Sequence, residues 1–500
     1  MKTGNGRLGL WATVFLAAVS SPIPTRAAEG VRESWDAVYF GNSRAGYIHT
    51  TVTPVKDPKT NRDLVRVQVE TSLLFKRDKD SASIELLYGT IETPEGSVLR
   101  LDSRTLASRQ EMRTFGDVVD GKMTLTLEGA GQKQQKVIPW GPEVRGPYGA
   151  EMSLSREPIK PGETREVKIF TPDLNRVGVA KLAAKEMESV PIGGGSRRDL
   201  LRVEQVTYID DQPQPGPQTH WVDSSGQILR TYVDLFGGMT TYRTTREAAL
   251  RSIGGAKFDL NAATLIKVRR AINNPTNSRE IVYDLTLKGE DPVKLFPNDA
   301  RQTLTPGNTP GAARLVVKTA SPNDGQPGPE AVDAEYLRAN AYVTTEDARV
   351  VALAKRVVGS IADPWQKAVA IEHWVFENMK KKNFETVFAP ANDVARDLEG
   401  DCTEHSVLTA AMCRVVGVPS RVVVGLLYVE PTQSFGFHMW NEVYVNRRWV
   451  ALDATWDQSA VDAVHIKLTE SSLDGVAPTE SFMAVARLAN KTTIEPVEVR

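Results

Sequence analysis

The sequence has little cysteine, no surplus of basic residues and no long uncharged hydrophobic run. Only two cysteines, Cys402 and Cys413, occur among 500 residues, too few for a disulfide-stabilised scaffold or a cysteine-rich zinc module. Lysine and arginine total 61 against 62 acidic residues, so we expect no nucleic-acid partner. The chain must fold around ordinary hydrophobic cores, for which 41% hydrophobic residues are sufficient.

Residues 1–27 have the features of a secretory signal peptide. Lys2 and Arg7 precede an apolar run over residues 8–19, and a stretch with small residues ends at Ala27. The run is shorter than the roughly 20 residues that a membrane-spanning helix needs. We therefore expect an exported chain, periplasmic or extracellular, with no membrane span after cleavage; a retained N-terminal anchor is the alternative.

Residues 28–250 follow the pattern of half-buried β-strands. Between Val65 and Phe75, apolar side chains recur at every second position, the period of a strand with one face on a core. Turn pairs such as Asp120-Gly121 separate further runs of this kind. We predict an all-β domain, an antiparallel meander or curved sheet, with a possible role in binding.

Two further regions follow, separated by a change of periodicity. Residues 251–333 predict a small β-rich region and a linker, because strand-like alternation gives way to a cluster of proline and glycine over 321–329. Over 334–460, helical patterns come first and strand patterns second, which indicates an α+β domain. We treat 461–500 as a C-terminal tail.

Two helix starts are predicted in the α+β domain. Thr345 is expected to cap the first helix, which would end at Gly359. Asp363-Pro364 is expected to open the second, since a cap residue followed by proline is typical of a first helical turn.

Cys402 stands at the predicted start of another helix, after Gly400 and the candidate cap Asp401. Unpaired N–H groups and the helix dipole stabilise a thiolate there and lower the pKa of a thiol. A buried structural cysteine is the alternative. Cys413 lies eleven residues further along the same predicted helix, roughly 16 Å away, so a disulfide is excluded. Its apolar neighbours indicate a core position.

A histidine and an aspartate fall on two predicted strands downstream. His438 shares a strand face with Trp440, and Asn446-Arg447 forms a two-residue turn into the next strand. With that turn, Trp440 faces Asp453, and His438 and Asp453 become diagonal neighbours within hydrogen-bonding reach. Taken singly, each residue is better explained as structural, and only their joint placement with Cys402 favours a catalytic role.

The motifs around these residues resemble the transglutaminase-like superfamily, a branch of the papain-type folds. They are Gly-Asp-Cys-Thr-Glu-His-Ser at 400–406, Gly-Val-Pro-Ser-Arg at 417–421, His-Met-Trp at 438–440 and Trp-Val-Ala-Leu-Asp-Ala-Thr at 449–455. The resemblance covers about 340–460. It implies Cys402 as nucleophile, His438 as general base and later acid, and Asp453 as the residue that orients His438.

The chemistry implied is acyl transfer through a thioester on peptide or isopeptide bonds of a protein or peptide substrate. We expect hydrolysis more than crosslinking, since water is always available outside the cytosol. A crosslinking transglutaminase would differ only in the acceptor. A catalytically idle scaffold or binding protein of the cell envelope, with the same fold, is the alternative from another functional class.

No cofactor and no metal are expected. His405 follows Cys402 by three residues, but this pair lacks the two further ligands of a structural zinc site. No loop of the EF-hand type is present in the sequence. His373 and His465 are expected to lie at the solvated surface.

Overall fold

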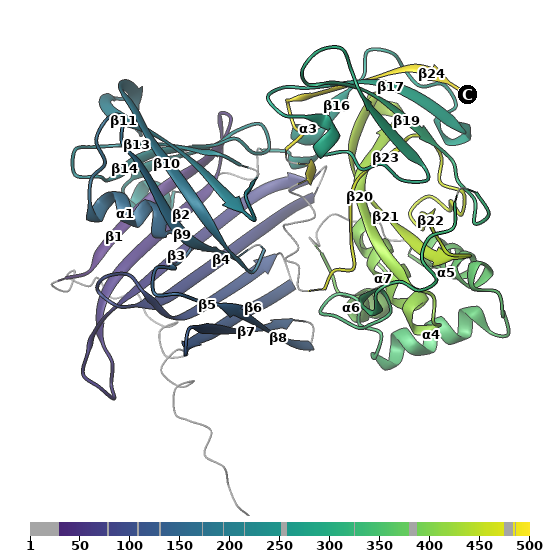
Figure 1. Cartoon of the computed structure of the whole chain (residues 1–500), viewed down its shortest axis with the longest axis horizontal. Coiled ribbons are helices and arrows are strands. Elements are labelled where there is room, and N and C mark those ends of the chain that lie inside the picture. Colours follow the sequence, from purple (N-terminus) through teal and green to yellow (C-terminus); the bar gives the residue numbers. More distant parts are fainter. Residues whose placement is uncertain are drawn as a thin grey trace, which may run out of the picture.

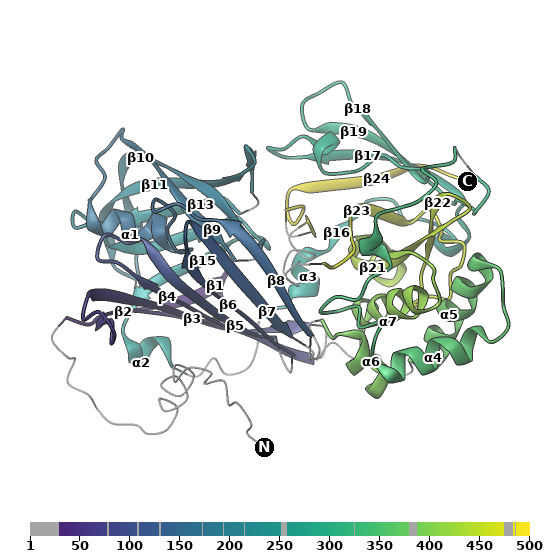
Figure 2. The ribbon, with the colours of Figure 1, turned by 60° about the horizontal axis from the view of Figure 1, so that its bottom comes forward.

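The computed structural model describes residues 30–500 except 78–79, 108–109, 130–131, 173, 194, 215, 252–257, 325, 380–387, 475–483 and 486. The predicted signal peptide, residues 1–27, lies outside the described residues. Figures 1 and 2 show a strand-rich N-terminal part beside a C-terminal part of helices and strands. The fold class predicted from the sequence is thereby confirmed.

The N-terminal part is built on one antiparallel sheet. Its strands are β1 (Arg32–Phe40), β2 (Ser43–Lys56), β3 (Asp63–Arg77), β4 (Asp80–Glu92), β5 (Val98–Ala107), β6 (Gln110–Val119), β7 (Lys122–Gly129), β8 (Gln132–Pro139), β9 (Thr164–Thr171), β10 (Arg176–Pro191), β11 (Arg197–Ile209), β12 (Gln212–Pro213), β13 (Gln218–Val222), β14 (Ile228–Val233) and β15 (Met239–Thr244). Strands β1 to β8 pair in chain order, as in the predicted meander, and β15 joins them on the other side of β1.

This sheet bends so that its two edges share a core. Phe170 on the edge strand β9 packs in one hydrophobic cluster with Leu125 on β7 and Trp140, which follows β8. Helix α1 (Gly149–Arg156) connects the edges and buries Leu154 in a second cluster. Apolar and polar residues alternate along the strands, so one face of the sheet is apolar. The twisted sheet curves around this face and thereby covers it.

The C-terminal part has helices first and strands second. The helices are α4 (Ala348–Val358), α5 (Pro364–Asn378), α6 (Ala391–Asp397) and α7 (Cys402–Val415), and the strands are β20 (Ser420–Val429), β21 (Ser434–Val445), β22 (Arg448–Leu452) and β23 (His465–Ser471). The sheet order is β16-β21-β20-β23, with β16 (Ile266–Lys267) at one edge and β22 paired to β21. Helices α4, α5 and α6 pack around α7, which lies against β20 and β21.

The two predicted helix starts have different outcomes. Asp363 caps α5 with its side chain and Pro364 is the first helical residue, as predicted. The prediction for Thr345 is wrong: Asp347 caps α4, accepting hydrogen bonds from the N–H groups of Arg349 and Val350. Both residue types cap helices, and aspartate adds a charge that suits the helix dipole.

A third sheet packs on the sheet β16-β21-β20-β23, and the two share one hydrophobic core. It has the order β18 (Gln302–Pro306), β19 (Ala312–Lys318), β17 (Glu280–Leu287) and β24 (Thr492–Val499). Strands β23 and β24 both belong to residues 461–500, which we predicted to be a C-terminal tail. This segment instead contributes one strand to each of two sheets. Pairing partners so distant along the chain leave no local signal.

Short elements connect these parts. They are α2 (Arg246–Ala249), α3 (Leu260–Thr264) and the 3₁₀ turns η1 (Pro275–Asn277), η2 (Pro292–Lys294), η3 (Ala334–Tyr336) and η4 (Glu430–Thr432). Among the described residues, no helix is long and apolar enough to cross a membrane.

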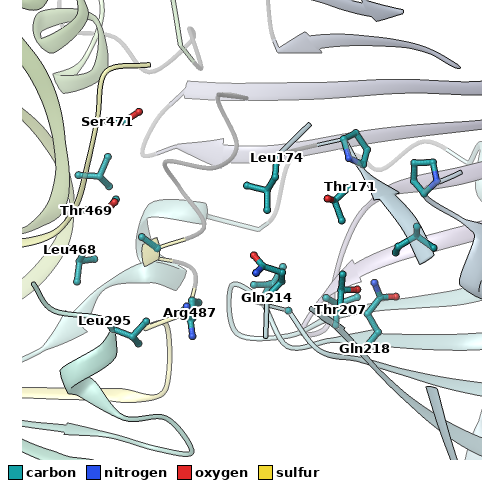
Figure 3. Close-up of a pocket in the computed structure, with 18 of the residues that line it drawn as sticks. Thr171, Leu174, Thr207, Gln214, Gln218, Leu295, Leu468, Thr469, Ser471 and Arg487 are labelled. Atoms are coloured by element: carbon teal, nitrogen blue, oxygen red, sulfur yellow. The ribbon is translucent and has the colours of Figure 1, made fainter. Parts of the chain in front are cut away.

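A cavity of about 590 Å³ lies between the two parts of the chain (Figure 3). Thr171 and Gln214 line it from the N-terminal sheet, and Thr469 and Arg487 from the C-terminal part. The two parts also touch where Met112 on β6 packs against the C-terminal core and where Lys491 pairs with Asp234 at 2.6 Å.

Candidate active site

Cys402 is the first residue of α7, and a capping box holds it there. The Asp401 side chain accepts a hydrogen bond from the Thr403 N–H at 2.8 Å, and the Glu404 carboxyl accepts one from the Asp401 N–H at 2.9 Å. Gly400 precedes them with a φ of 138°, and a Cβ there would lie 2.6 Å from the Cβ of Glu404. Only glycine fits this approach, so the motif before the cysteine is required by the turn into the helix.

Glu404 also fastens the neighbouring chain to this helix start. It is fully buried, and its second oxygen accepts a hydrogen bond from the Ala389 N–H at 2.9 Å. Burial and the nearby Asp401 carboxylate raise the pKa of Glu404 to about 8. His405, whose Nδ1 lies 2.7 Å from the Asp401 carbonyl oxygen, is buried in the same turn. The first turn of α7 is therefore rigidly built around the half-buried Cys402.

Cys413 lies in the interior, as predicted. It has no exposed surface and belongs to the core cluster of the C-terminal part. Burial raises the pKa of its thiol to about 12. This cysteine is a small apolar core residue at neutral pH.

The predicted hairpin and its register are confirmed. Asn446 and Arg447 have φ values of 49° and 61°, as a two-residue type I′ turn requires. Asn441 pairs with Leu452, the register that places Asp453 diagonally from His438. The His438 Nε2 donates a hydrogen bond to the Asp453 Oδ2 at 2.6 Å.

Helix α7 and strand β21 run side by side in the same direction. The Asn441 side chain donates to the Ser406 carbonyl at 2.9 Å, and further along the Ser420 hydroxyl, on the neighbouring strand, donates to the Ala410 carbonyl at 2.8 Å. Cys402 lies about 6 Å back from Ser406 along the helix, and His438 about 10 Å back from Asn441 along the strand. The cysteine and the histidine thus belong to the same end of the helix–strand pair.

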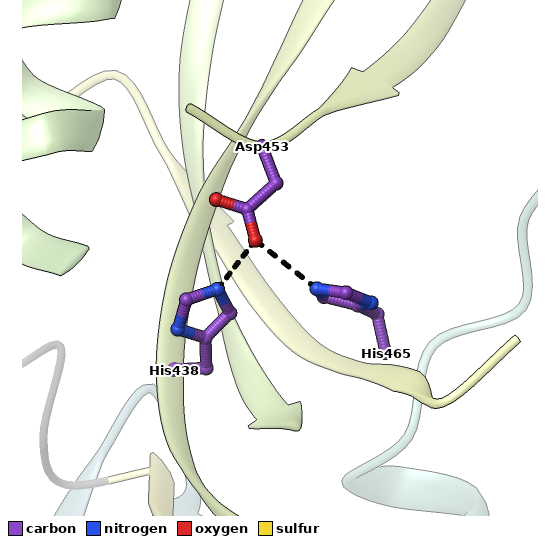
Figure 4. A group of neighbouring side chains, drawn as sticks. All are labelled: His438, Asp453 and His465. Carbon is purple, nitrogen blue, oxygen red and sulfur yellow. Dashed lines mark hydrogen bonds and ion pairs between the residues drawn. The ribbon is translucent and has the colours of Figure 1, made fainter. Parts of the chain in front are cut away.

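Asp453 is fully buried, and each of its carboxylate oxygens accepts hydrogen bonds. Oδ1 accepts from the Thr455 N–H at 2.8 Å, and Oδ2 accepts from His438 and, at 3.1 Å, from the Nε2 of His465 (Figure 4). Burial alone would raise the pKa of Asp453, but the charges and hydrogen bonds of the two histidines outweigh it and hold that pKa well below its usual range. The carboxylate is ionised and fixed in orientation.

His465 is the residue that sequence analysis misjudged. It has no exposed surface, and its Nδ1 lies 2.7 Å from the Oδ1 of Asp462. The expectation of a solvated histidine is wrong because β23 pairs with β20 inside the core and the third sheet covers it. The apolar run from Ala463 to Ile466 was the available signal for a buried strand. His373, in contrast, is exposed on α5 and pairs with Asp457 at 2.7 Å.

The buried ring of Trp440 packs against both histidines. The centre of its ring lies 6.0 Å from that of His438, with an angle of 21° between the ring planes. The corresponding values for His465 are 5.3 Å and 79°. Such packing restricts the rotation of both imidazoles.

Within the described residues, His438, Asp453 and His465 are a candidate group for binding a metal ion. Their possible ligand atoms all lie within 4.8 Å of one another. Both imidazoles are 2.6–3.1 Å from one carboxylate oxygen, which are hydrogen-bond lengths. Asp462 engages the remaining nitrogen of His465. We therefore interpret the group as a hydrogen-bond network.

Comparison with known proteins finds a family match over part of the C-terminal region. Residues 351–454 match the model of the Transglutaminase-like superfamily. The chain is 34% identical to the kyphoscoliosis peptidase of Homo sapiens over 83 residues. This stretch is 15% of this chain and 13% of that protein. Over 97 residues it is 30% identical to an uncharacterized protein of Haemophilus influenzae, 18% of this chain and 26% of that one. The chain thus spans about a quarter or less of these relatives.

Solved structures resemble larger parts of the chain at low identity. The periplasmic domain of TgpA from Pseudomonas aeruginosa is 13% identical, with a TM-score of 0.24, over 36% of this chain and 92% of that one. A domain of unknown function from Brucella abortus is 11% identical, with a TM-score of 0.32, over 43% of this chain and 95% of that one. The family match covers Cys402, His438 and Asp453, and residues 351–454 of this chain are a transglutaminase-like domain.

Proposed function

We propose that the protein is an exported cysteine-dependent hydrolase whose transglutaminase-like domain cleaves peptide or isopeptide bonds, with Cys402, His438 and Asp453 as its catalytic triad. The observation that carries this proposal is the 2.6 Å hydrogen bond from His438 to a buried, ionised Asp453, on the strand beside the helix that begins at Cys402. That is the order nucleophile, base and orienting acid that thiol acyl transfer needs.

The steps follow from this arrangement. Because the Nε2 of His438 is bonded to Asp453, Nδ1 is the nitrogen that takes the proton of the Cys402 thiol. The thiolate adds to the substrate carbonyl, and the Cys402 N–H at the helix start stabilises the oxyanion. His438 then protonates the leaving amine, the C–N bond breaks, and a thioester remains on Cys402. Water attacks the thioester with His438 as base, which releases the carboxylic acid and restores the thiol.

Hydrolysis is favoured over crosslinking by the expected location. The sequence pattern of residues 1–27 supports export, and outside the cytosol water competes with any amine acceptor. The partial identity to a protein named a peptidase supports the same choice. A protein or peptide is the proposed substrate.

The test is the pH dependence of iodoacetamide alkylation, resolved by site with mass spectrometry, on the chain without residues 1–27. We expect Cys402 to react below about pH 7 and to lose this reactivity in His438→Ala. His373→Ala is the matched control, because that histidine is exposed and paired with Asp457, and it should leave the profile unchanged.

Two assays then separate the candidate reactions. Release of new amino termini from a casein substrate would support hydrolysis, and incorporation of a labelled amine into the same substrate would support crosslinking. A Cys402 that reacts only near pH 8.5, like an ordinary thiol, would contradict the proposal and favour an idle scaffold.

A further inference from the structure

The site contains a buried pair that the steps above do not use, Asp462 and His465. Both are nearly or fully without exposed surface. The Nδ1 of His465 lies 2.7 Å from Asp462 and its Nε2 lies 3.1 Å from Asp453, whose other neighbour is His438. An unbroken chain of hydrogen bonds therefore runs from Asp462 through His465 and Asp453 to the proposed base.

The bonding pattern determines the charge of His465. Asp453 accepts from the Thr455 N–H on one oxygen and from both histidines on the other. Asp462 likewise accepts on both oxygens, from the Val464 N–H at 3.2 Å and the Gln458 amide at 2.8 Å. Each nitrogen of His465 therefore lies within hydrogen-bonding distance of a carboxylate oxygen, and an imidazole that donates to both carboxylates carries a proton on each nitrogen. His465 is then an imidazolium.

We propose that His465 is a positioning residue, a buried imidazolium between Asp462 and Asp453 that aims the Asp453 carboxylate at His438 and offsets part of its charge. It thereby sets the pH range in which His438 can hold the thiol proton. The role toward Cys402 rests on the proposed function, whereas the charge and contacts of His465 do not.

The groups around His465 are consistent with a cation there. From the third sheet and its loops, the Arg301 guanidinium donates to the Asp462 carbonyl at 2.6 Å and the Tyr283 hydroxyl to the Ala463 carbonyl at 3.0 Å. From β21, the His438 ring centre lies 5.5 Å away. From α5, the buried Glu372 faces Asp453. Burial would lower the pKa of His465, but its two carboxylate partners raise it above the usual value.

A second buried histidine in the chain has the opposite environment. His220 on β13 is almost fully buried, and its Nδ1 lies 3.0 Å from the hydroxyl of Thr231. Burial lowers the pKa of His220 to about 4, so that it is neutral at pH 7. It is a matched control for burial without a carboxylate partner.

The first test measures the charge state directly. The chain has six histidines, and nitrogen-15 NMR of the histidine-labelled protein distinguishes protonated from bare ring nitrogens. We expect His465 to carry protons on both nitrogens at pH 7 and His220 to carry one, with assignment by single His→Gln variants. A neutral His465 at pH 7 would overturn the proposal, whatever the activity of Cys402.

The second test separates positioning from a merely structural role. His465→Gln retains a donor toward Asp453 but removes the charge. Because a cation 5.5 Å from the His438 ring disappears, we expect the pH midpoint for deprotonation of His438 to rise by about one unit or more. The alkaline limb of the pH profile of Cys402 alkylation should move to higher pH by a similar amount. His220→Gln should change neither the His438 midpoint nor this profile.

Two outcomes are then distinguishable. If His465→Gln lowers thermal stability but leaves the His438 midpoint where it was, His465 is structural and the inference fails. If the midpoint moves as expected while Cys402 is inert toward alkylation in every variant, the positioning role of His465 holds and the proposed function fails.

Discussion

Helix α7 carries both cysteines of the chain and gives them opposite surroundings. At its first turn, Cys402 is half-buried and held by a capping box. In its last turns, Cys413 is fully buried, and burial raises the pKa of its thiol to about 12. The residue type and the helix are the same, so the position along the helix decides whether a thiol is available for chemistry.

The largest expected difference is in reactivity. At pH 7, a thiol with a pKa near 12 is ionised to only about one part in 10⁵. We expect Cys402 to be alkylated at least about 10³-fold faster than Cys413, measured by site-resolved mass spectrometry. In denaturant the two rates should converge, and similar rates in the native protein would contradict the comparison.

Glu372 on α5 lies near Cys413, and its negative charge adds to the rise in the pKa of that thiol. Burial, with the charges of Asp457 and Asp453, raises the pKa of Glu372 to about 8. The folded state then binds a proton that the unfolded state releases above about pH 4.5, so stability falls as pH rises from about 4.5 to 8. Glu372→Gln removes this loss. Relative to the parent protein, we expect the variant to gain about 4 kcal/mol between pH 5 and pH 8.5 in urea denaturation.

The control for this result is Glu377→Gln on the same helix, whose side chain is exposed. It should follow the pH dependence of the parent protein. Identical pH dependence of Glu372→Gln and the parent would show that Glu372 is ionised in the folded state.

Removing each thiol should affect stability in the opposite order, with a larger loss for Cys413 than for Cys402. Cys413→Ala leaves a small cavity in a close-packed core and should lower the free energy of unfolding by about 1–2 kcal/mol. Cys402→Ala, at a half-buried position, should change it by less than about 0.5 kcal/mol while it abolishes turnover. Chemical denaturation of both variants measures this, and a larger loss for Cys402→Ala would reverse our assignment.

The smallest expected effect concerns the cap. Asp401→Ala removes the acceptor of the Thr403 N–H and should cost about 1 kcal/mol. Asp401→Asn keeps an acceptor and should stay within a few tenths of the parent protein. Equal losses in the two variants would indicate that the charge of Asp401, and not its hydrogen bond, holds the start of α7.

Much of the site was predictable because its signals are local. Gly400 and Asp401 mark a helix start, which places Cys402 in a first turn. Asn446-Arg447 sets a hairpin register, and the register brings Asp453 to His438. His465 was not predictable in the same way, because its burial depends on pairing between β23 and β20 and on a sheet completed by the last strand of the chain.

The strand-rich N-terminal part, the α+β order of the C-terminal part and the transglutaminase-like motifs could all be predicted from the amino-acid sequence. Helix caps, two-residue turns and the period of apolar residues act over a few positions, so one sequence suffices to find them. The place of His465 beside Asp453 and the completion of the third sheet by β24 depend instead on strand pairings, β23 with β20 and β24 with β17. These pairings join segments far apart in the chain, and only burial in a common core brings the strands together.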